Sequence, residues 1–156
     1  MNKPPSSNEL PLTGESFMHL PMSIQVGGDH YKKMPIQPAE FNELNNIPYC
    51  MANVIKYICR HKMKGGKQDL GKAMHYCDLG ASMYEQTKKA WKTQCRANEW
   101  LITPTRFCKM NAFTDEITQA VLALCSVFEA GVISYLQAKQ VIAEIIHLEY
   151  PPVRPR

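Results

Sequence analysis

Apolar residues recur every three or four positions along most of the chain after residue 37, which is the period of an amphipathic helix. Pro38 at a first helical position opens a short predicted helix, Ala39 to Asn45, which ends at Asn45-Asn46. Four longer helices are predicted over Pro48 to about Met63, about Gln68 to Lys89, Thr114 to Gly131, and Ser134 to about Tyr150. Thr114 and Ser134 are the expected capping residues of the last two. The predicted fold class is therefore all-α.

The first two long helices share a pattern of polar positions. At 100° per residue, Asn53, Lys56 and Arg60 fall within about 60° of one another, opposite an apolar stripe. The next helix repeats this spacing with Asp69, Lys72 and Tyr76. A short Gly65-Gly66 turn joins the two helices, so we expect an antiparallel hairpin with its apolar stripes toward the core. The polar stripes would then share one rim.

The sequence divides the chain into four parts. Residues 1–22 are rich in Pro and Ser and predict a flexible tail. Residues 23–90 should form the helical core. Residues 91–112 mix aromatic residues with Pro104. Their pattern does not decide between a loop, a short strand, a linker and a lid. Residues 113–156 predict a C-terminal helical hairpin that forms a second layer or an oligomer contact.

Composition narrows the class of protein. The 156 residues carry a net charge of +4, which permits anionic ligands but is too small for a dedicated nucleic-acid binder. The six cysteines form no C-x-x-C pair and no signal peptide is evident, so we expect reduced thiols in a cytoplasmic protein. No apolar run approaches the roughly 20 residues of a membrane span.

The chemistry of the chain gathers between residues 27 and 76. No P-loop or Rossmann pattern occurs, but Gly27 and Gly28 precede His30 and could offer backbone N–H groups to a phosphate; an ordinary turn is the alternative. Lys56, Arg60 and Lys64 share one side of a helix and match phosphate oxygens, although a solvated helix face would look the same. We expect Lys32, Lys33 and Lys72 near these side chains.

Carboxylates and aromatic residues add further candidates. Asp69, with Asp29 as a second choice, could hold Mg²⁺ beside nucleotide phosphates, or it could simply stabilise the start of its helix. Asn53 and Tyr57 could read a sugar or a base on which Tyr31 or Tyr76 stacks, but tyrosines at helical spacing are also ordinary packing residues. The histidines match no zinc motif.

The order and spacing of these motifs resemble the small phage nucleotide kinase family. The resemblance covers Gly27 to about Tyr84 and consists of Gly-Gly-Asp-His-Tyr-Lys, Pro-Ile-Gln-Pro-x-Glu-Phe, Asn-x-x-Lys-Tyr-x-x-Arg-x-x-x-Lys and Asp-Leu-x-Lys-Ala-x-x-Tyr. It implies phosphoryl transfer from a nucleoside triphosphate to a deoxynucleoside monophosphate without a P-loop, in the host cytoplasm if the chain is phage-encoded. The matching positions are His30, Tyr31, Asn53, Lys56, Tyr57, Arg60, Lys64, Asp69, Lys72 and Tyr76.

Our leading hypothesis is thus a deoxynucleoside monophosphate kinase that uses Mg²⁺. The expected catalytic residues are His30, Lys56, Arg60 and Asp69, with Asp69 as the metal ligand. Expected nucleotide-binding residues are Gly27, Gly28, Tyr31, Lys32, Asn53, Tyr57, Lys64, Lys72 and Tyr76.

Because the rim is shallow, a homo-oligomer is expected, and Arg60→Ala should abolish turnover while leaving the fold intact. The alternatives are a non-catalytic nucleotide-binding protein, such as a sponge or a modulator of host nucleotide-based defence, and an all-α nucleotide pyrophosphatase using Glu40, Glu43 and Asp69. A host-interaction protein acting through the C-terminal hairpin is the least favoured.

Overall fold

The computed structural model describes residues 28–94 and 99–152, and no strand occurs among them. The all-α prediction is confirmed. The elements are α3 (Pro38–Leu44), α4 (Tyr49–Arg60), the 3-10 turn η1 (His61–Met63), α5 (Gly66–Gln94), α6 (Pro104–Met110), α7 (Asp115–Cys125), α8 (Val127–Ala130) and α9 (Val132–Glu149). The predicted tail, residues 1–22, lies outside the described residues.

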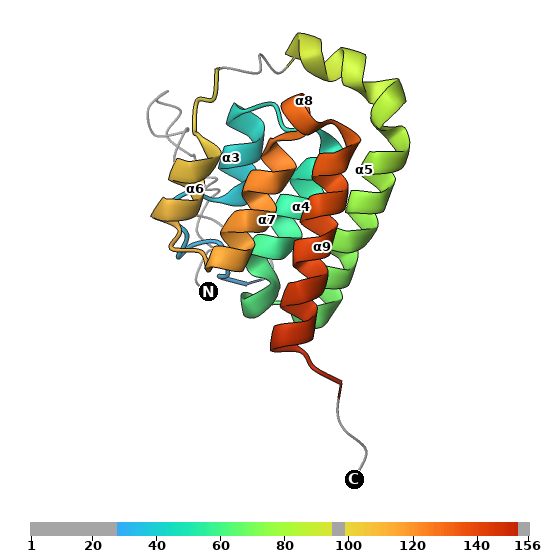
Figure 1. The fold of residues 1–156 in the computed structure, drawn as a ribbon. Coiled ribbons are helices and arrows are strands. Elements are labelled where there is room, and N and C mark those ends of the chain that lie inside the picture. The colour runs from blue at the N-terminus through green and yellow to red at the C-terminus, as the bar shows by residue number, and fades with distance from the viewer. Residues whose placement is uncertain (1–27, 95–98, 153–156) are drawn as a thin grey trace, which may run out of the picture.

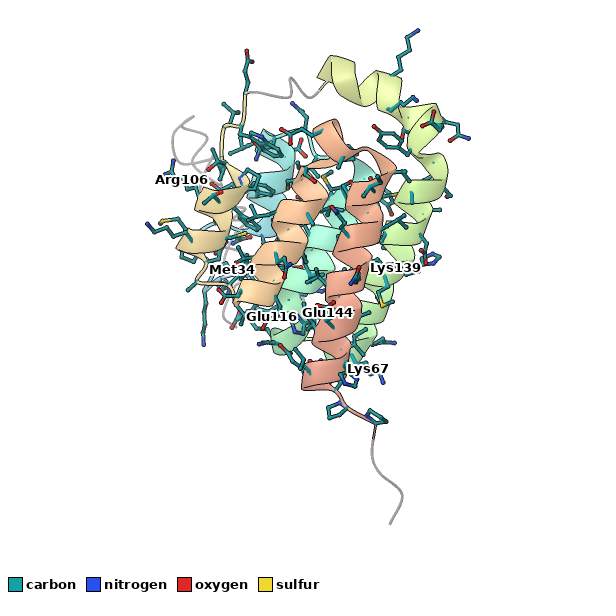
Figure 2. The ribbon with its side chains drawn as sticks, viewed as in Figure 1. Met34, Lys67, Arg106, Glu116, Lys139 and Glu144 are labelled. Carbon is teal, nitrogen blue, oxygen red and sulfur yellow. The ribbon has the colours of Figure 1, made fainter. Side chains whose placement is uncertain are left out.

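Four helices form the centre of the molecule. Helix α4 packs on α5, α5 on α9, α9 on α7, and α7 on α4, so the contacts close a ring. Figure 1 shows that neighbours in this ring run in opposite directions, as expected for helices joined by short turns. The predicted α4–α5 hairpin and the predicted C-terminal α7–α9 hairpin thus form two halves of one bundle. Lys139 of α9 links them by pairing with Asp78 of α5 at 2.6 Å (Figure 2).

The core of the bundle contains the apolar stripes seen in the sequence. Its largest fully buried apolar side chains are Phe41, Met51, Ile55, Ile58, Leu70, Phe107, Leu124, Tyr135, Ile142 and Ile145. Each such side chain contributes about 1.5–3 kcal/mol when it leaves water. Tyr135 of α9 packs directly against Gly80 of α5, where a β-carbon would lie 2.4 Å from the Tyr135 ring. The packing of the two halves therefore requires glycine at this position.

The starts of α7 and α9 show which of the two predicted capping residues does cap its helix. Thr114 caps α7 as predicted, and its hydroxyl accepts a hydrogen bond from the Ile117 N–H at 3.4 Å. Ser134 does not cap α9, because the helix already begins at Val132 after Gly131, whose φ is +63°. The Ser134 hydroxyl instead donates back to the Gly131 carbonyl at 2.7 Å from within the first turn. Gly131 can adopt this positive φ without the steric cost that a side chain imposes.

The segment before α7 differs from the loop, strand or lid that we expected. Thr103 caps helix α6, which packs against α7 and buries Phe107 and Cys108 in the core. The segment leading into α6 is held by Asn45, which accepts from the Leu101 N–H at 3.0 Å and donates to the Ile102 carbonyl at 2.9 Å. This part of residues 91–112 therefore belongs to the core.

The cysteines behave as expected for reduced thiols. Cys50, Cys59, Cys77, Cys108 and Cys125 are free and buried, while Cys95 lies outside the described residues. Burial raises the pKa of each of these five thiols, which keeps them protonated and unreactive. Within residues 28–94 and 99–152, no helix has the length and apolar character needed to cross a membrane.

Candidate functional site

Packing α4 against α5 brings positive side chains from both helices to one tyrosine. The Lys56 Nζ lies 4.5 Å from the centre of the Tyr57 ring, the Arg60 guanidinium 4.7 Å and the Lys72 Nζ 5.4 Å. An aromatic face attracts cations at such distances. We call Lys56, Arg60, Lys64 and Lys72 the cation cluster. Its members were predicted from the two polar stripes, and the structure places three of them around Tyr57.

A single buried carboxylate anchors this cluster. The Asp69 side chain is 1% exposed; Arg60 Nε donates to its Oδ2 at 2.8 Å and Arg60 Nη2 to its Oδ1 at 3.4 Å. Lys72 reaches the same Oδ1 at 3.3 Å. Burial alone would raise the pKa of Asp69, but hydrogen bonds from Arg60 and Lys72 outweigh it and hold the pKa below its usual value. The carboxylate is thus ionised and fixes the orientation of two cations.

Glycine is required for Asp69 to take this place. A β-carbon on Gly65 would lie 2.1 Å from Asp69 Cγ, so the carboxylate occupies space that a side chain at residue 65 would need. The first turn of α5 also starts here, because the Gln68 and Asp69 N–H groups donate to the Gly65 carbonyl. The Gly-Gly turn therefore does more than join two helices: it makes room for the anchor of the cluster.

The side chain of Asn53 holds the side chain of Lys56 in place. The Asn53 side chain is buried; its Nδ2 donates to the Tyr49 carbonyl at 2.9 Å and its Oδ1 accepts from Lys56 Nζ at 2.6 Å. The nucleotide-binding role predicted for Asn53 stays a prediction. Its side-chain amide holds the Lys56 ammonium in place, so it can also affect a ligand through Lys56.

The loop before α3 lies against the cluster. Gly27 is outside the described residues, but Gly28 has a φ of +124°, a conformation suited to glycine. Burial, with the nearby charges of Lys64 and Arg60, keeps the pKa of His30 below its usual value, so its imidazole is mostly neutral at pH 7. The Tyr31 hydroxyl lies next to the Arg60 guanidinium. Lys32 pairs with Asp29 at 2.8 Å at the exposed end of the loop.

Three tyrosines continue the site along the same face of α4 and α5. Tyr57 and Tyr76 stack with ring centres 5.9 Å apart, and Tyr49 meets Tyr76 edge-on at the same distance. The Tyr49 and Tyr76 hydroxyls lie 3.5 Å apart, and this hydrogen bond raises the pKa of Tyr76 to about 12. Tyr49 is 70% exposed. We call Tyr49, Tyr57 and Tyr76 the tyrosine row; it offers aromatic faces beside the cation cluster.

The expected metal-binding role of Asp69 stays a prediction, and the geometry gives this carboxylate another task. Both of its oxygens already accept from Arg60 or Lys72, and Asp29 pairs with Lys32. Within the described ranges, no three His, Cys, Asp or Glu side chains come together in a group that could hold a metal. The donor set therefore does not fit direct coordination of Mg²⁺.

Residues from the C-terminal end of α9 contact the turn that carries Lys64. We call the contacts of Glu149 with Lys62 and His61, together with that of Tyr150 with Gly66, the clasp. Glu149, at the end of α9, accepts from Lys62 at 2.9 Å and lies 3.0 Å from Nε2 of the fully buried His61. The His61 Nδ1 lies 2.8 Å from the Ile58 carbonyl, which can only accept a hydrogen. These two contacts fix the His61 ring between Ile58 of α4 and Glu149 of α9. The Tyr150 ring closes the clasp against Gly66.

The sequence analysis missed Tyr49 and the clasp. Tyr49 precedes Asn53 by four residues and Tyr57 by eight, so the helical period already placed it on the same face. Glu149 lies 88 residues from His61, and no local pattern links them. The expectation that Arg60→Ala would leave the fold intact does not agree with this geometry, because the substitution would strip the buried Asp69 of its main partner.

Comparison with known proteins gives one match. The family described as a protein of unknown function, DUF3310, matches residues 26–78. No curated protein and no solved structure matches the chain. The matched stretch contains the cation cluster, Asp69 and the tyrosine row, whereas α6 to α9 lie outside it. The family description assigns no activity.

Proposed function

We propose that this protein binds nucleotides at the α4–α5 rim and acts as a deoxynucleoside monophosphate kinase. The observation that carries the proposal is the convergence of Lys56, Arg60 and Lys72 on Tyr57, beside the exposed end of the tyrosine row. Phosphate groups need several cationic donors, and a base or sugar needs an aromatic or polar surface within reach of them. The resemblance of residues 27–84 to small phage nucleotide kinases supports the same choice.

The arrangement suits phosphoryl transfer between two nucleotides. The terminal phosphorus of the triphosphate would leave its bridging oxygen and bond to a phosphate oxygen of the monophosphate, giving two diphosphates. That acceptor oxygen is already ionised at neutral pH, since the second pKa of a phosphate monoester is about 6, so no general base is required. Lys56, Arg60 and Lys64 would neutralise charge on the transferring group, the main task of a protein in this reaction.

The other residues would position these groups. A mostly neutral His30 can donate a hydrogen bond to a phosphate oxygen without adding charge. Asp69 would keep Arg60 and Lys72 in fixed orientations, which lowers the entropy lost when they bind phosphate. Tyr76 and Tyr49 would contact the base. The proposed Mg²⁺ requirement and the homo-oligomer both remain predictions.

A non-catalytic nucleotide-binding protein is the second candidate. It is favoured by the engagement of both Asp69 oxygens, which leaves the cluster well suited to hold phosphates but poorly suited to bind metal. The pyrophosphatase alternative is weaker. It needs converging carboxylates, and Glu40, Glu43 and Asp69 form no metal-binding group in the described part of the chain.

The deciding experiment incubates purified protein and Mg²⁺ with each deoxynucleoside monophosphate and each triphosphate, followed by ion-exchange chromatography of the products. Equal amounts of two diphosphates would support the kinase. Saturable binding without turnover would support the binding protein, and release of pyrophosphate the pyrophosphatase. Neither turnover nor binding would reject all three.

A matched pair of variants ties any activity to the cation cluster. Lys64 is exposed and Lys109 of α6 is exposed elsewhere, so both can be replaced by Ala with little effect on folding. Lys64→Ala should lower kcat/KM at least about tenfold, the value of one charge-assisted contact to phosphate, while Lys109→Ala should not change it. If both substitutions change kcat/KM equally, the active site does not lie at the α4–α5 rim.

A further inference from the structure

A second surface feature is formed in part by the loop that carries His30 and Tyr31. It is a pocket of about 270 Å³ between this loop, the end of α4 with η1, and the α6–α7 turn. We call it the Lys33 pocket. It is lined by Lys33, Met34, Cys59, Lys62, Met63, Asn111, Ala112, Phe113, Thr114 and Ile117. Figure 2 shows Met34 toward the same end of α7 as Glu116. Its size is just below the roughly 300–1,000 Å³ of most ligand pockets.

The walls of this pocket are held by specific contacts. Asn111 donates from Nδ2 to the Ile36 carbonyl at 2.8 Å and accepts at Oδ1 from the Ile36 N–H at 3.3 Å, so the loop is fixed to the end of α6. Ala112 follows with a φ of +49°, and the Phe113 N–H returns to the Cys108 carbonyl at 3.3 Å. This hydrogen bond closes the tight turn that forms one wall.

The lining combines apolar surface with positive charge. The inner surface is formed by thioether, thiol, aromatic and aliphatic side chains, among them Met34, Met63 and Phe113. Methionine adapts to flat ligands and contacts aromatic rings favourably. Lys33 and Lys62 are both exposed; Lys62 pairs with Glu149, and the charge of Lys33 acts on Asp29, which is itself paired with Lys32. A pocket with an apolar lining and positive charge at its edge favours a ligand that combines a ring with an anionic group.

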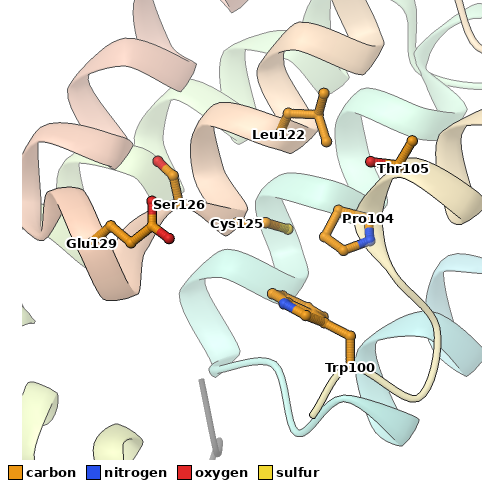
Figure 3. A pocket seen from close by; sticks show the side chains of 7 residues that line it. All are labelled: Trp100, Pro104, Thr105, Leu122, Cys125, Ser126 and Glu129. Atoms are coloured by element: carbon orange, nitrogen blue, oxygen red, sulfur yellow. The ribbon is translucent and has the colours of Figure 1, made fainter. Parts of the chain in front are cut away.

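Two other pockets among the described residues lack this combination. The pocket in Figure 3, of about 180 Å³, has Trp100 and Leu122 but only an acidic charged group, Glu129. A third, of about 110 Å³ between Tyr49 and Tyr135, contains no charged side chain. Only the Lys33 pocket, among these three, has both an apolar lining and positive charge.

From this geometry we infer that the Lys33 pocket is a second ligand site, which takes a small planar ring bearing one anionic group, the class to which a mononucleotide belongs. The ring would lie against Met34, Met63 and Phe113, and the anion would face Lys33. The site is separate from the cation cluster, although Cys59 in its wall is the residue before Arg60. The inference does not depend on the kinase reaction and would still hold if the protein had no kinase activity.

The test uses the full chain labelled with ¹³C at its methionine methyl groups. Each deoxynucleoside monophosphate, its matched nucleoside and inorganic phosphate are titrated separately and followed by NMR, with single Met→Leu variants for assignment. A monophosphate should shift the Met34 and Met63 methyls saturably, whereas Met83, which lines the pocket that contains Tyr49, reports separately on binding beside the tyrosine row. Inorganic phosphate should leave Met34 and Met63 unmoved, because it has no ring to bury.

Charge reversals separate the two sites. Lys33→Glu should weaken monophosphate binding reported by Met34 and Met63 about five- to tenfold, and hardly affect the nucleoside. Lys109→Glu makes the same charge change outside the pocket and should have little effect. If Lys64→Glu abolishes the Met34 and Met63 shifts while Lys33→Glu does not, the ligand binds only at the cation cluster and the inference is wrong. Equal shifts with inorganic phosphate, or none with any probe, would also overturn it.

Discussion

Replacing Gly65 by Ala tests whether Asp69 holds the cation cluster together. The new β-carbon would lie 2.1 Å from Asp69 Cγ and 2.3 and 2.5 Å from its oxygens, whereas non-bonded carbon atoms rest at about 3.5–4.0 Å. Asp69 is 1% exposed and cannot turn toward water without leaving Arg60. The variant must therefore shift the turn or separate the carboxylate from its two cations.

Such overpacking typically costs about 1–3 kcal/mol, and weakened pairing of a buried charge adds to it. We expect a loss of about 2–3 kcal/mol in the free energy of unfolding, or about 5–10 °C in Tm at this chain length. Gly71→Ala is the matched control. No atom lies within 4 Å of a β-carbon at Gly71, so in the middle of α5 this change should stabilise by about 0.5–1 kcal/mol.

The assay is thermal and urea unfolding followed by circular dichroism, with nucleotide affinity measured on the same samples below Tm. Gly65→Ala should also weaken nucleotide binding, because Arg60 and Lys72 lose their fixed orientations, and Gly71→Ala should not. If Gly65→Ala unfolds together with the control and binds equally well, Asp69 does not organise the cluster.

Three further predictions follow from single contacts. Gly80→Ala should cost about 1–3 kcal/mol of stability by overpacking against Tyr135, and Tyr135→Leu in the same chain should recover part of it; additive urea midpoints would contradict this. Tyr49→Phe should bring the pKa of Tyr76 down from about 12, as followed by ¹³C NMR of the tyrosine ring; an unchanged titration would exclude the hydroxyl contact. Burial raises the pKa of Glu149, but contacts with Lys62 and His61 outweigh it and depress the value below 4.5, so this stabilisation is complete above pH 4.5 and lost as pH falls further. Wild type should therefore exceed Glu149→Gln in urea stability at pH 7, and the difference should shrink in acid; a constant difference would refute the linkage.

Much of the fold was predictable because helix signals are local. The apolar period along α4 and α5, Pro38 at the start of α3 and the Thr114 cap all act within a few residues of their positions. Local signals failed where two of them competed. Ser134 is a good capping residue, but Gly131 with positive φ lies three residues earlier and lets α9 begin sooner. The aromatic residues around Pro104 gave no clear period, and α6 is fixed by its burial against α7.

The sequence by itself determined the long helices α4 and α5, their hairpin and the side of each that carries charge, because a period of 3.6 residues assigns every position to a face. It also brought Arg60 and Asp69 forward as candidates, but with separate tasks. Only the tertiary structure joined them as a pair over Gly65, turned Asn53 toward Lys56, and closed the clasp between His61 and Glu149. Such contacts depend on the register and distance between packed helices. A repeating pattern within one helix contains no information about either.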